Sequence, residues 1–141
     1  MSELNDTLRV PREPPKVRNF VKPFWDATRA GKLMLQYDRK AGRYQFYPRV
    51  AGIGSGSRDL EWREASGKGQ IFTYTVARRA REPFRGHEPF LIAMVTLDEG
   101  VNIMANIVNC PLEAMKIGMR VKLTWAPMSD GSRLFMFEPE R

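Results

Sequence analysis

The stretch Ser66-Gly-Lys-Gly-Gln-Ile-Phe-Thr-Tyr-Thr-Val-Ala-Arg-Arg79 decides the fold that this chain is predicted to adopt. Two glycines open the stretch, and a run of β-branched and aromatic residues follows, which is typical of a β-strand. Alternation along a strand predicts that the odd-numbered residues of 71–77 share one face and the even-numbered residues of 72–78 share the other. Because glycine tolerates a bend, a long strand opened by glycine is typical of a sheet that curls into a small barrel.

Four more strands and one short helical segment are predicted after this strand. Turn residues separate the segments, notably Asp98-Glu-Gly100 and Ser129-Asp-Gly131. The strands are predicted over 90–97, 101–108, 120–126 and 134–137, and the helical segment over 112–115. Five strands with a helical segment between the third and the fourth match the oligonucleotide/oligosaccharide-binding (OB) barrel, and strands at this spacing also fit other small barrels. Of these, we predict an OB barrel over residues 66–141.

The chain begins with a predicted arm and a predicted helix. Residues 1–18 hold three prolines among charged residues, which predicts an extended arm. This arm is either a disordered tail or a segment that packs on a partner. Residues 19–31 are predicted to form a short helix, because Pro23 suits a first helical turn and Gly31 suits a C-terminal cap.

A small β-module is predicted over residues 32–65, between the helix and the barrel. Two short strands at 32–36 and 44–47 form a hairpin. A glycine- and serine-rich loop at 50–57 follows, and a third short strand occupies 59–65.

Composition restricts the classes of partner and compartment. The 141 residues are 43% hydrophobic, which suits one domain with an added module. No apolar run is long enough to span a membrane, and no secretory signal opens the chain. The single cysteine, Cys110, cannot form an internal disulfide, which indicates a cytoplasmic protein. The net charge of +7 favours nucleic acid, a phosphate-bearing ligand or an acidic protein surface as partner.

Several blocks of sequence, in a fixed order, carry a resemblance to a known family. They are Phe24-Trp25, Gly31-Lys-Leu33, Leu35-Gln36, Phe46-Tyr-Pro-Arg49, Leu60-Glu-Trp62, Ser66–Gly69 with Thr73–Val76, Leu97–Gly100, Asn106 and Ile117-Gly-Met119. Over residues 20–139 the chain resembles the domain-of-unknown-function thirty-five family, acyl-CoA-associated proteins with a zinc ribbon and an OB-fold. The resemblance implies an all-β protein with a short N-terminal helix, in which a degenerate rubredoxin-like zinc ribbon precedes a five-stranded OB-fold barrel.

The resemblance also implies four zinc-ligand positions, and none of them holds cysteine here. They fall on Asp38, Ala41, Gly52 and Ser55. A structural zinc ion needs four thiolate or imidazole ligands, so we predict that this ribbon holds no zinc and that the chain carries no cofactor. Without zinc, the ribbon is either held by side-chain packing, for instance around Tyr37, Tyr44, Phe46 and Tyr47, or it is loose.

The strongest candidate for ligand binding is a cluster of four arginines after the first barrel strand: Arg78, Arg79, Arg81 and Arg85. Arginine binds phosphate through paired hydrogen bonds, and coenzyme A carries several phosphates, so acyl-CoA is the candidate ligand. The alternative is a solvated loop whose charges face water.

Aromatic residues of the predicted helix are the candidates for partner docking. Phe20, Phe24 and Trp25 either pack on the chain's own barrel or form a contact between subunits. Other reactive side chains lack a catalytic setting. His87 is predicted to be a loop residue, Cys110 an incidental one, and Asp98 with Glu99 a turn.

Two classes of function follow. In the first, the chain is a non-catalytic accessory subunit that binds acyl-CoA and docks a thiolase-like, lipid-transfer-type or hydratase enzyme, as the resemblance implies. In the second, it binds single-stranded nucleic acid through a basic groove and stacking aromatics. A stand-alone hydratase or hydrolase is a third class, for which the sequence offers no acid–base set. Self-association stays open.

Overall fold

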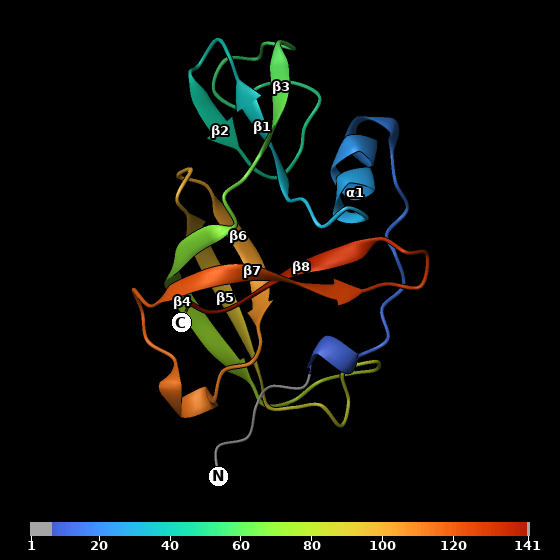
Figure 1. Ribbon diagram of the computed structural model, residues 1–141, viewed down its shortest axis with the longest axis vertical. Coiled ribbons are helices and arrows are strands. Elements are labelled where there is room, and N and C mark those ends of the chain that lie inside the picture. The colour runs from blue at the N-terminus through green and yellow to red at the C-terminus, as the bar shows by residue number, and fades with distance from the viewer. Residues whose placement is uncertain (1–6, 141) are drawn as a thin grey trace.

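Two β-modules stacked end to end make up most of the structure, a computed structural model that describes residues 7–140 (Figure 1). The smaller module is a three-stranded sheet of order β2-β1-β3, and the larger is a closed barrel of order β4-β5-β6-β8-β7. The sheet contains β1 (Met34–Asp38), β2 (Arg43–Gln45) and β3 (Leu60–Glu64). The barrel contains β4 (Lys68–Ala77), β5 (Phe90–Leu97), β6 (Asn102–Ile107), β7 (Arg120–Pro127) and β8 (Arg133–Pro139).

The barrel closes as an OB-fold does. Antiparallel pairing joins β4 to β5, β5 to β6 and β7 to β8, and β4 also pairs with β7 over Lys68–Gln70. The seam between β6 and β8 is parallel and short: Ile107 pairs with Phe137, and the Val108 N–H donates to the Phe137 carbonyl at 2.9 Å. A 3-10 turn, η3 (Leu112–Ala114), lies between β6 and β7. The predicted fold class is confirmed, an all-β chain with one short helix and a five-stranded barrel.

The predicted faces of β4 are wrong beyond Phe72. The pairing register between β4 and β5 shifts between Ile71 and Thr73, so Phe72 is an extra residue in a β-bulge. A bulge exchanges the two faces of all later residues. Ile71 is 1% exposed, and Tyr74 and Val76 pack against the same core, whereas the Phe72 side chain is 59% exposed.

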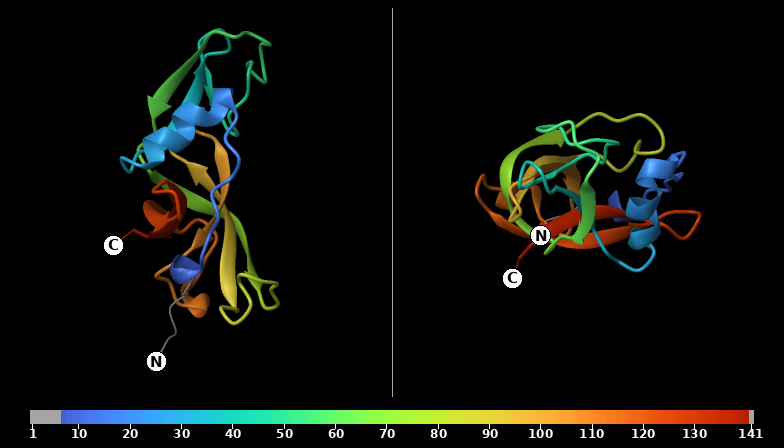
Figure 2. Two further views of the ribbon diagram at one scale, coloured as in Figure 1. Left: turned by 90° about the vertical axis from the view of Figure 1, so that its right-hand side faces the viewer. Right: turned by 90° about the horizontal axis from the view of Figure 1, so that it is seen from above.

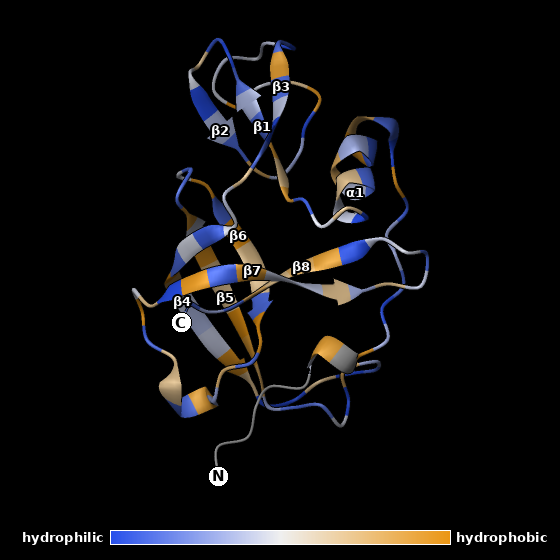
Figure 3. Cartoon of the chain, viewed as in Figure 1, coloured by the Kyte–Doolittle hydropathy of each residue, from blue (hydrophilic) through white to orange (hydrophobic). Residues whose placement is uncertain are grey.

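One hydrophobic core joins the helix, the small sheet and the barrel. Phe24 and Leu35 belong to the same buried cluster as Leu91, Val95 and Phe137 of the barrel. Figure 3 shows that the hydrophobic residues concentrate on the barrel strands, while β2 is mostly hydrophilic. The three-stranded module is thus anchored to the barrel by apolar burial at its base.

The helix α1 (Lys22–Thr28) is shorter than predicted, because a 3-10 turn, η2 (Asn19–Val21), forms its first part. Pro23 lies in the first helical turn, and Gly31 has a φ of +71°, where a side chain would be strained. The buried Thr28 hydroxyl accepts a bond of 3.1 Å from the Arg133 N–H, which attaches the helix to β8.

The described part of the predicted arm packs on this chain's own barrel, an arrangement that neither sequence alternative included. Residues 1–6 of that arm lie outside the described residues. The 3-10 turn η1 (Thr7–Arg9) starts the described part. Leu8 packs against a cluster of buried barrel residues, and Val10 is 2% exposed. From there the segment runs along the barrel toward α1, as the left view of Figure 2 shows.

Candidate functional site

The arginine loop, residues 78–89 between β4 and β5, lies at the barrel end farthest from the three-stranded sheet (Figure 1). Two turns shape it, since the Phe84 N–H donates to the Arg81 carbonyl at 2.9 Å and the His87 N–H donates to the Phe84 carbonyl at 2.9 Å. All four predicted arginines are exposed: Arg78, Arg79, Arg81 and Arg85. Their charges are therefore accessible to an anion in solution.

Arg12 joins this end of the barrel and was not predicted from the sequence. Its guanidinium lies 5.5 Å from the centroid of the Phe84 ring, a cation–π contact. It also donates to the carbonyls of Thr7 at 2.6 Å and Val10 at 3.0 Å. Partial burial lowers the pKa of Arg12 from its ordinary value. More than 70 residues separate Arg12 from Phe84 in the chain, so no local sequence signal could have indicated this contact.

An apolar cavity of about 300 Å³ opens beside the arginine loop. We call it the seam cavity, because it lies between β6 and β8, where the barrel pairing is shortest. The rings of Phe84 and Phe90, with centroids 5.2 Å apart, form one wall. The remaining lining residues are Ile92, Met104, Ala105, Asn106, Leu134 and Phe135.

A second cavity, of about 470 Å³, lies beneath the helix and shares Leu134 and Phe135 with the seam cavity. We call it the aromatic groove. Phe20 of η2 and Tyr47, which follows β2, line it and are 38% and 49% exposed. Lys16 and Arg18 contribute exposed positive charge.

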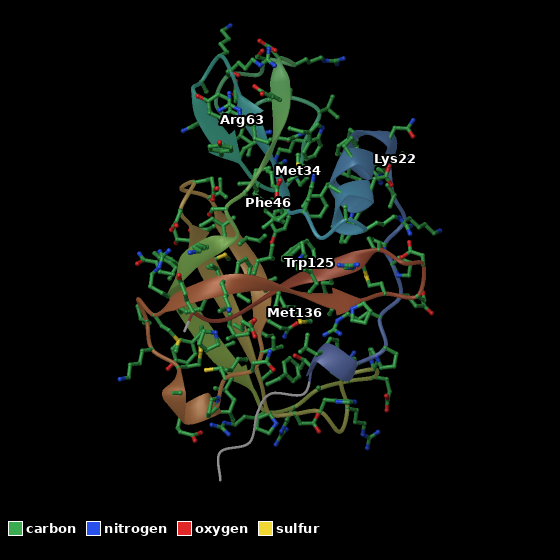
Figure 4. The ribbon with its side chains drawn as sticks, in the orientation of Figure 1. Lys22, Met34, Phe46, Arg63, Trp125 and Met136 are labelled. Atoms are coloured by element: carbon green, nitrogen blue, oxygen red, sulfur yellow. The ribbon has the colours of Figure 1, made fainter. Side chains whose placement is uncertain are left out.

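The three rings predicted for docking differ in exposure. Phe20 is exposed and Trp25 is half-buried, but Phe24 is 3% exposed. The Phe24 ring lies 5.9 Å from Phe46 and 6.1 Å from Phe135, so it joins the helix, the small sheet and the barrel. Figure 4 shows Phe46 at this junction. Phe24 therefore stabilises the chain's own core, and the docking prediction depends on Phe20 and the half-buried Trp25.

The four positions at which the resemblance implies zinc ligands come together at the tip of the three-stranded sheet. Asp38, which is 1% exposed, lies at their centre. Its Oδ2 accepts from the Ser55 hydroxyl at 2.7 Å, and its Oδ1 accepts from the backbone N–H groups of Ala41 and Lys40, both at 3.0 Å. A β-carbon placed on Gly52 would lie 2.1 Å from Oδ2. These hydrogen bonds hold the pKa of Asp38 below its ordinary value. The bond from Ser55 has the largest effect and the bond from the Ala41 N–H the next largest.

The donors at this tip do not fit a structural zinc ion. Such an ion takes four thiolate or imidazole ligands, whereas these positions offer one carboxylate and one hydroxyl. Within residues 7–140, no three or more Asp, Glu, His or Cys side chains are grouped so that they could hold a metal ion. That the ribbon works without zinc stays a prediction, which elemental analysis of the purified chain tests.

Two buried amides hold the loop that follows β2, a role that sequence reasoning missed. Gln36 and Gln45 bond to each other at 2.9 Å. Gln36 also bonds the backbone N–H and carbonyl of Arg49, each at 2.8 Å, and Gln45 accepts from the Ile53 N–H at 2.8 Å. Aromatic packing contributes as predicted at Tyr37, whose ring lies 5.0 Å from that of Tyr44. Hydrogen bonds and ring packing together hold the three-stranded module.

The other reactive side chains occupy structural positions. Cys110 is buried, and its thiol donates to the Pro111 carbonyl at 3.3 Å. Asp98 binds Arg120 through two bonds of 2.9 and 3.0 Å, which lower the pKa of Asp98. Glu99 accepts from the Ser66 N–H at 2.7 Å. These two carboxylates fasten the turn after β5 to neighbouring segments of the barrel.

Comparison with known proteins supports the resemblance. The family model for the C-terminal OB-fold domain of ChsH2 matches residues 62–126. A DUF35 domain-containing scaffold protein of Methanocaldococcus jannaschii is 39% identical over 64 residues, which is 45% of this chain and 45% of that protein. The solved "Ltp2-ChsH2(DUF35) aldolase" matches 89% of this chain and 98% of its own chain, with a TM-score of 0.80 and 27% identity. This chain belongs to the DUF35 family.

Another relative of this DUF35 chain is named as part of an enzyme. A probable enoyl-CoA hydratase alpha subunit of Thermomonospora curvata is 30% identical over 117 residues, which is 82% of this chain and 36% of the relative. The matched segments thus span less than half the length of each of these two curated relatives. No helix within residues 7–140 has both the length and the apolar character needed to cross a membrane.

Proposed function

We propose that this DUF35 chain is a non-catalytic accessory subunit that binds acyl-CoA and docks an enzyme of acyl-CoA metabolism in the cytoplasm. The observation that carries the proposal is the pairing of an exposed arginine loop with an apolar cavity at one end of the barrel. Anionic phosphates fit the first and an acyl chain fits the second. The Cys110, Asp98 and Glu99 side chains, which could otherwise serve chemistry, are engaged in structural bonds.

The names of relatives support an enzyme as the partner. One relative is a hydratase alpha subunit, another is a scaffold protein, and the solved aldolase combines a DUF35 component with Ltp2. A thiolase-like or hydratase chain is therefore the partner that we propose for this chain.

The aromatic groove is the surface that we propose for docking. Phe20 and Tyr47 expose apolar area there, and Lys16 and Arg18 add positive charge. Aromatic rings are enriched at the centres of protein interfaces. An apolar partner surface bordered by acidic residues would match both features.

Co-expression tests the accessory role. The chain is produced with a thiolase-like chain and, separately, with a hydratase chain from the same organism, and a complex of defined stoichiometry with one of them is expected by size-exclusion chromatography with light scattering. Replacing both Phe20 and Tyr47 with serine is expected to weaken that complex by at least about tenfold, because exposed aromatic anchors dominate interface energy.

The matched control is Ile117→Ser, which alters a side chain that is 70% exposed and lies outside the groove. This control is expected to leave the complex unchanged. A chain that stays alone with each of these enzymes, or turns over an acyl thioester by itself, contradicts the accessory role.

Nucleic acid binding is less well supported. Within the described residues, the Phe72 ring of β4 is 59% exposed, while the Tyr74 ring is half-buried against the core. Binding of single strands depends on several rings that stack successive bases. The basic charge is thus better matched by a phosphate-bearing ligand at the arginine loop.

A further inference from the structure

We propose, resting on the acyl-CoA binding proposed above, that the seam cavity holds the acyl chain of a thioester whose phosphates lie on the arginine loop. Phe84 links the two sites, because its ring lines the cavity while its neighbours Arg81 and Arg85 are exposed. A ligand that is anionic at one end and apolar at the other fits this arrangement.

The charge beside the cavity is reinforced from outside the loop. Arg12 lies over the Phe84 ring and is held there by the carbonyls of Thr7 and Val10. Cations of the loop and of the N-terminal segment therefore lie next to Phe84, which forms an apolar wall of the cavity together with Phe90.

The barrel topology explains why a cavity exists at this place. Only a short parallel contact at Ile107 and Phe137 joins β6 to β8, so side chains rather than a ladder of backbone bonds meet above it. Leu134 and Phe135 form the far wall and also border the aromatic groove. An acyl chain longer than the seam cavity could extend toward the proposed docking surface.

Calorimetric titration with coenzyme A and with acetyl-, butyryl-, hexanoyl- and octanoyl-CoA tests the inference. Coenzyme A is expected to bind, and each buried methylene is expected to tighten binding by up to about fourfold until the cavity is full. Met104→Trp, which narrows the cavity from a half-exposed position, is expected to shorten the chain length at which affinity stops rising. Ile117→Trp is the matched control and is expected to leave the series unchanged.

The possible failures are distinguishable. If coenzyme A binds but affinity does not depend on chain length, the acyl-cavity inference is overturned while ligand binding at the loop stands. If the series is identical in Met104→Trp and in the parent chain, the chain length effect arises elsewhere and the inference is also overturned. If coenzyme A itself does not bind, the ligand-binding part of the proposed function fails.

An independent observation concerns the three-stranded module, which we call the ribbon module (residues 32–65). We infer that the Asp38 carboxylate takes the structural place of a metal ion. Its two oxygens accept hydrogen bonds from the Ser55 hydroxyl and from the N–H groups of Lys40 and Ala41. The absence of a side chain at Gly52 makes room for it, since a β-carbon there would lie 2.1 Å from Oδ2. The carboxylate therefore occupies the point on which the four former ligand positions converge.

Burial makes this arrangement depend on all its donors. A carboxylate that is 1% exposed needs hydrogen bonds or opposite charge to compensate for lost water. Three donors supply those bonds, and the charge of Arg43 acts on the same group. The loop that is closed in this way carries Val50 and Ile53, which are 52% and 58% exposed. The carboxylate thus orders a loop with an apolar surface.

Thermal unfolding with and without EDTA tests the inference. The parent chain is expected to contain no stoichiometric zinc and to keep its Tm in EDTA. Asp38→Ala is expected to lower the Tm by about 5–10 °C. Asp59→Ala removes an exposed carboxylate of the same module, which contacts Arg39 at 3.7 Å, and is expected to shift the Tm by about 1 °C. If Asp38→Ala does not fold, the milder Asp38→Asn is measured in its place.

Acid adds a second readout. Because the folded-state pKa of Asp38 is lowered, its contribution is present at neutral pH and is lost as the pH falls through that lowered value. The Tm difference between the parent chain and Asp38→Asn is thus expected to shrink below a pH of about 4. A constant difference contradicts a role for the charged carboxylate.

Restoring cysteine tests the geometry. Cysteines introduced together at Asp38, Ala41, Gly52 and Ser55 are expected to bind one zinc ion per chain, with a Tm that falls in EDTA. One zinc ion in the parent chain, equal Tm shifts in the two alanine variants, or no zinc in the four-cysteine variant would each overturn the inference.

Discussion

Replacing Phe24 with alanine is expected to lower the free energy of unfolding by about 3–5 kcal/mol. The ring is 3% exposed and contacts Trp25, Phe46 and Phe135, which belong to the helix, the loop after β2, and the barrel. Its removal would leave a cavity where the three parts of the structure meet, and the surrounding rings cannot all move to fill it. Urea unfolding followed by tryptophan fluorescence measures the change.

Phe20→Ala is the matched control. It removes a ring of the same kind, four residues earlier in the chain, from a position that is 38% exposed. It is expected to cost less than about 1 kcal/mol, since exposed apolar groups lose little burial. Equal losses for the two variants would contradict the placement of Phe24 in the core. The pair also separates stability from docking, since Phe20 is proposed to contact the partner and Phe24 to hold the fold.

Replacing both Arg81 and Arg85 with alanine is expected to weaken the affinity for coenzyme A about 100-fold. Each guanidinium can bind phosphate through charge-assisted hydrogen bonds, and loss of one such contact weakens binding at least about tenfold. Both side chains are exposed beside Phe84, so their removal leaves the core intact. Calorimetric titration at two salt concentrations measures the change. Added salt is expected to lower the affinity of the parent chain for coenzyme A more than that of the variant.

Replacing both Arg49 and Arg58 with alanine provides the control for net charge. Both side chains are exposed on the three-stranded module, so their removal lowers the charge by the same two units without altering the arginine loop. Affinity in this variant is expected to stay within about twofold of the parent chain, because the three-stranded module and the arginine loop lie at opposite ends of the molecule (Figure 1), where salt screens one from the other. Similar losses in both variants would show that overall charge, rather than the loop, attracts the ligand.

Local pattern was sufficient for the barrel and for its turns. The run from Ser66 to Arg79 contains the long strand β4 (Lys68–Ala77), and Asp98-Glu-Gly100 joins two strands, as their compositions predict. The pattern failed at Phe72 because a bulge depends on pairing with a second strand, which alternation in one strand cannot report. It also left open whether Phe24 packs inward or docks a partner, since apolar rings serve both purposes.

The candidate site was only partly predictable. The four arginines were identified because they lie within eight residues of one another in the sequence. All four are exposed in the loop that they occupy. Arg12, the seam cavity and the Gln36–Gln45 bond each join residues from separate segments. Such contacts cannot be predicted from sequence pattern, because the residues that form them are far apart in the chain.

The sequence by itself determined the order of the strands, the basic charge, the family and the absence of cysteine at the four positions where the resemblance implies zinc ligands. Tertiary structure decided how the residues at those positions are arranged. Asp38 looks like an ordinary turn residue in the sequence, and it becomes the centre of the ribbon because folding brings Ser55 and the open space at Gly52 to its carboxylate. Periodicity and composition act between near neighbours, whereas cavities, buried charges and their donors exist only where distant segments meet.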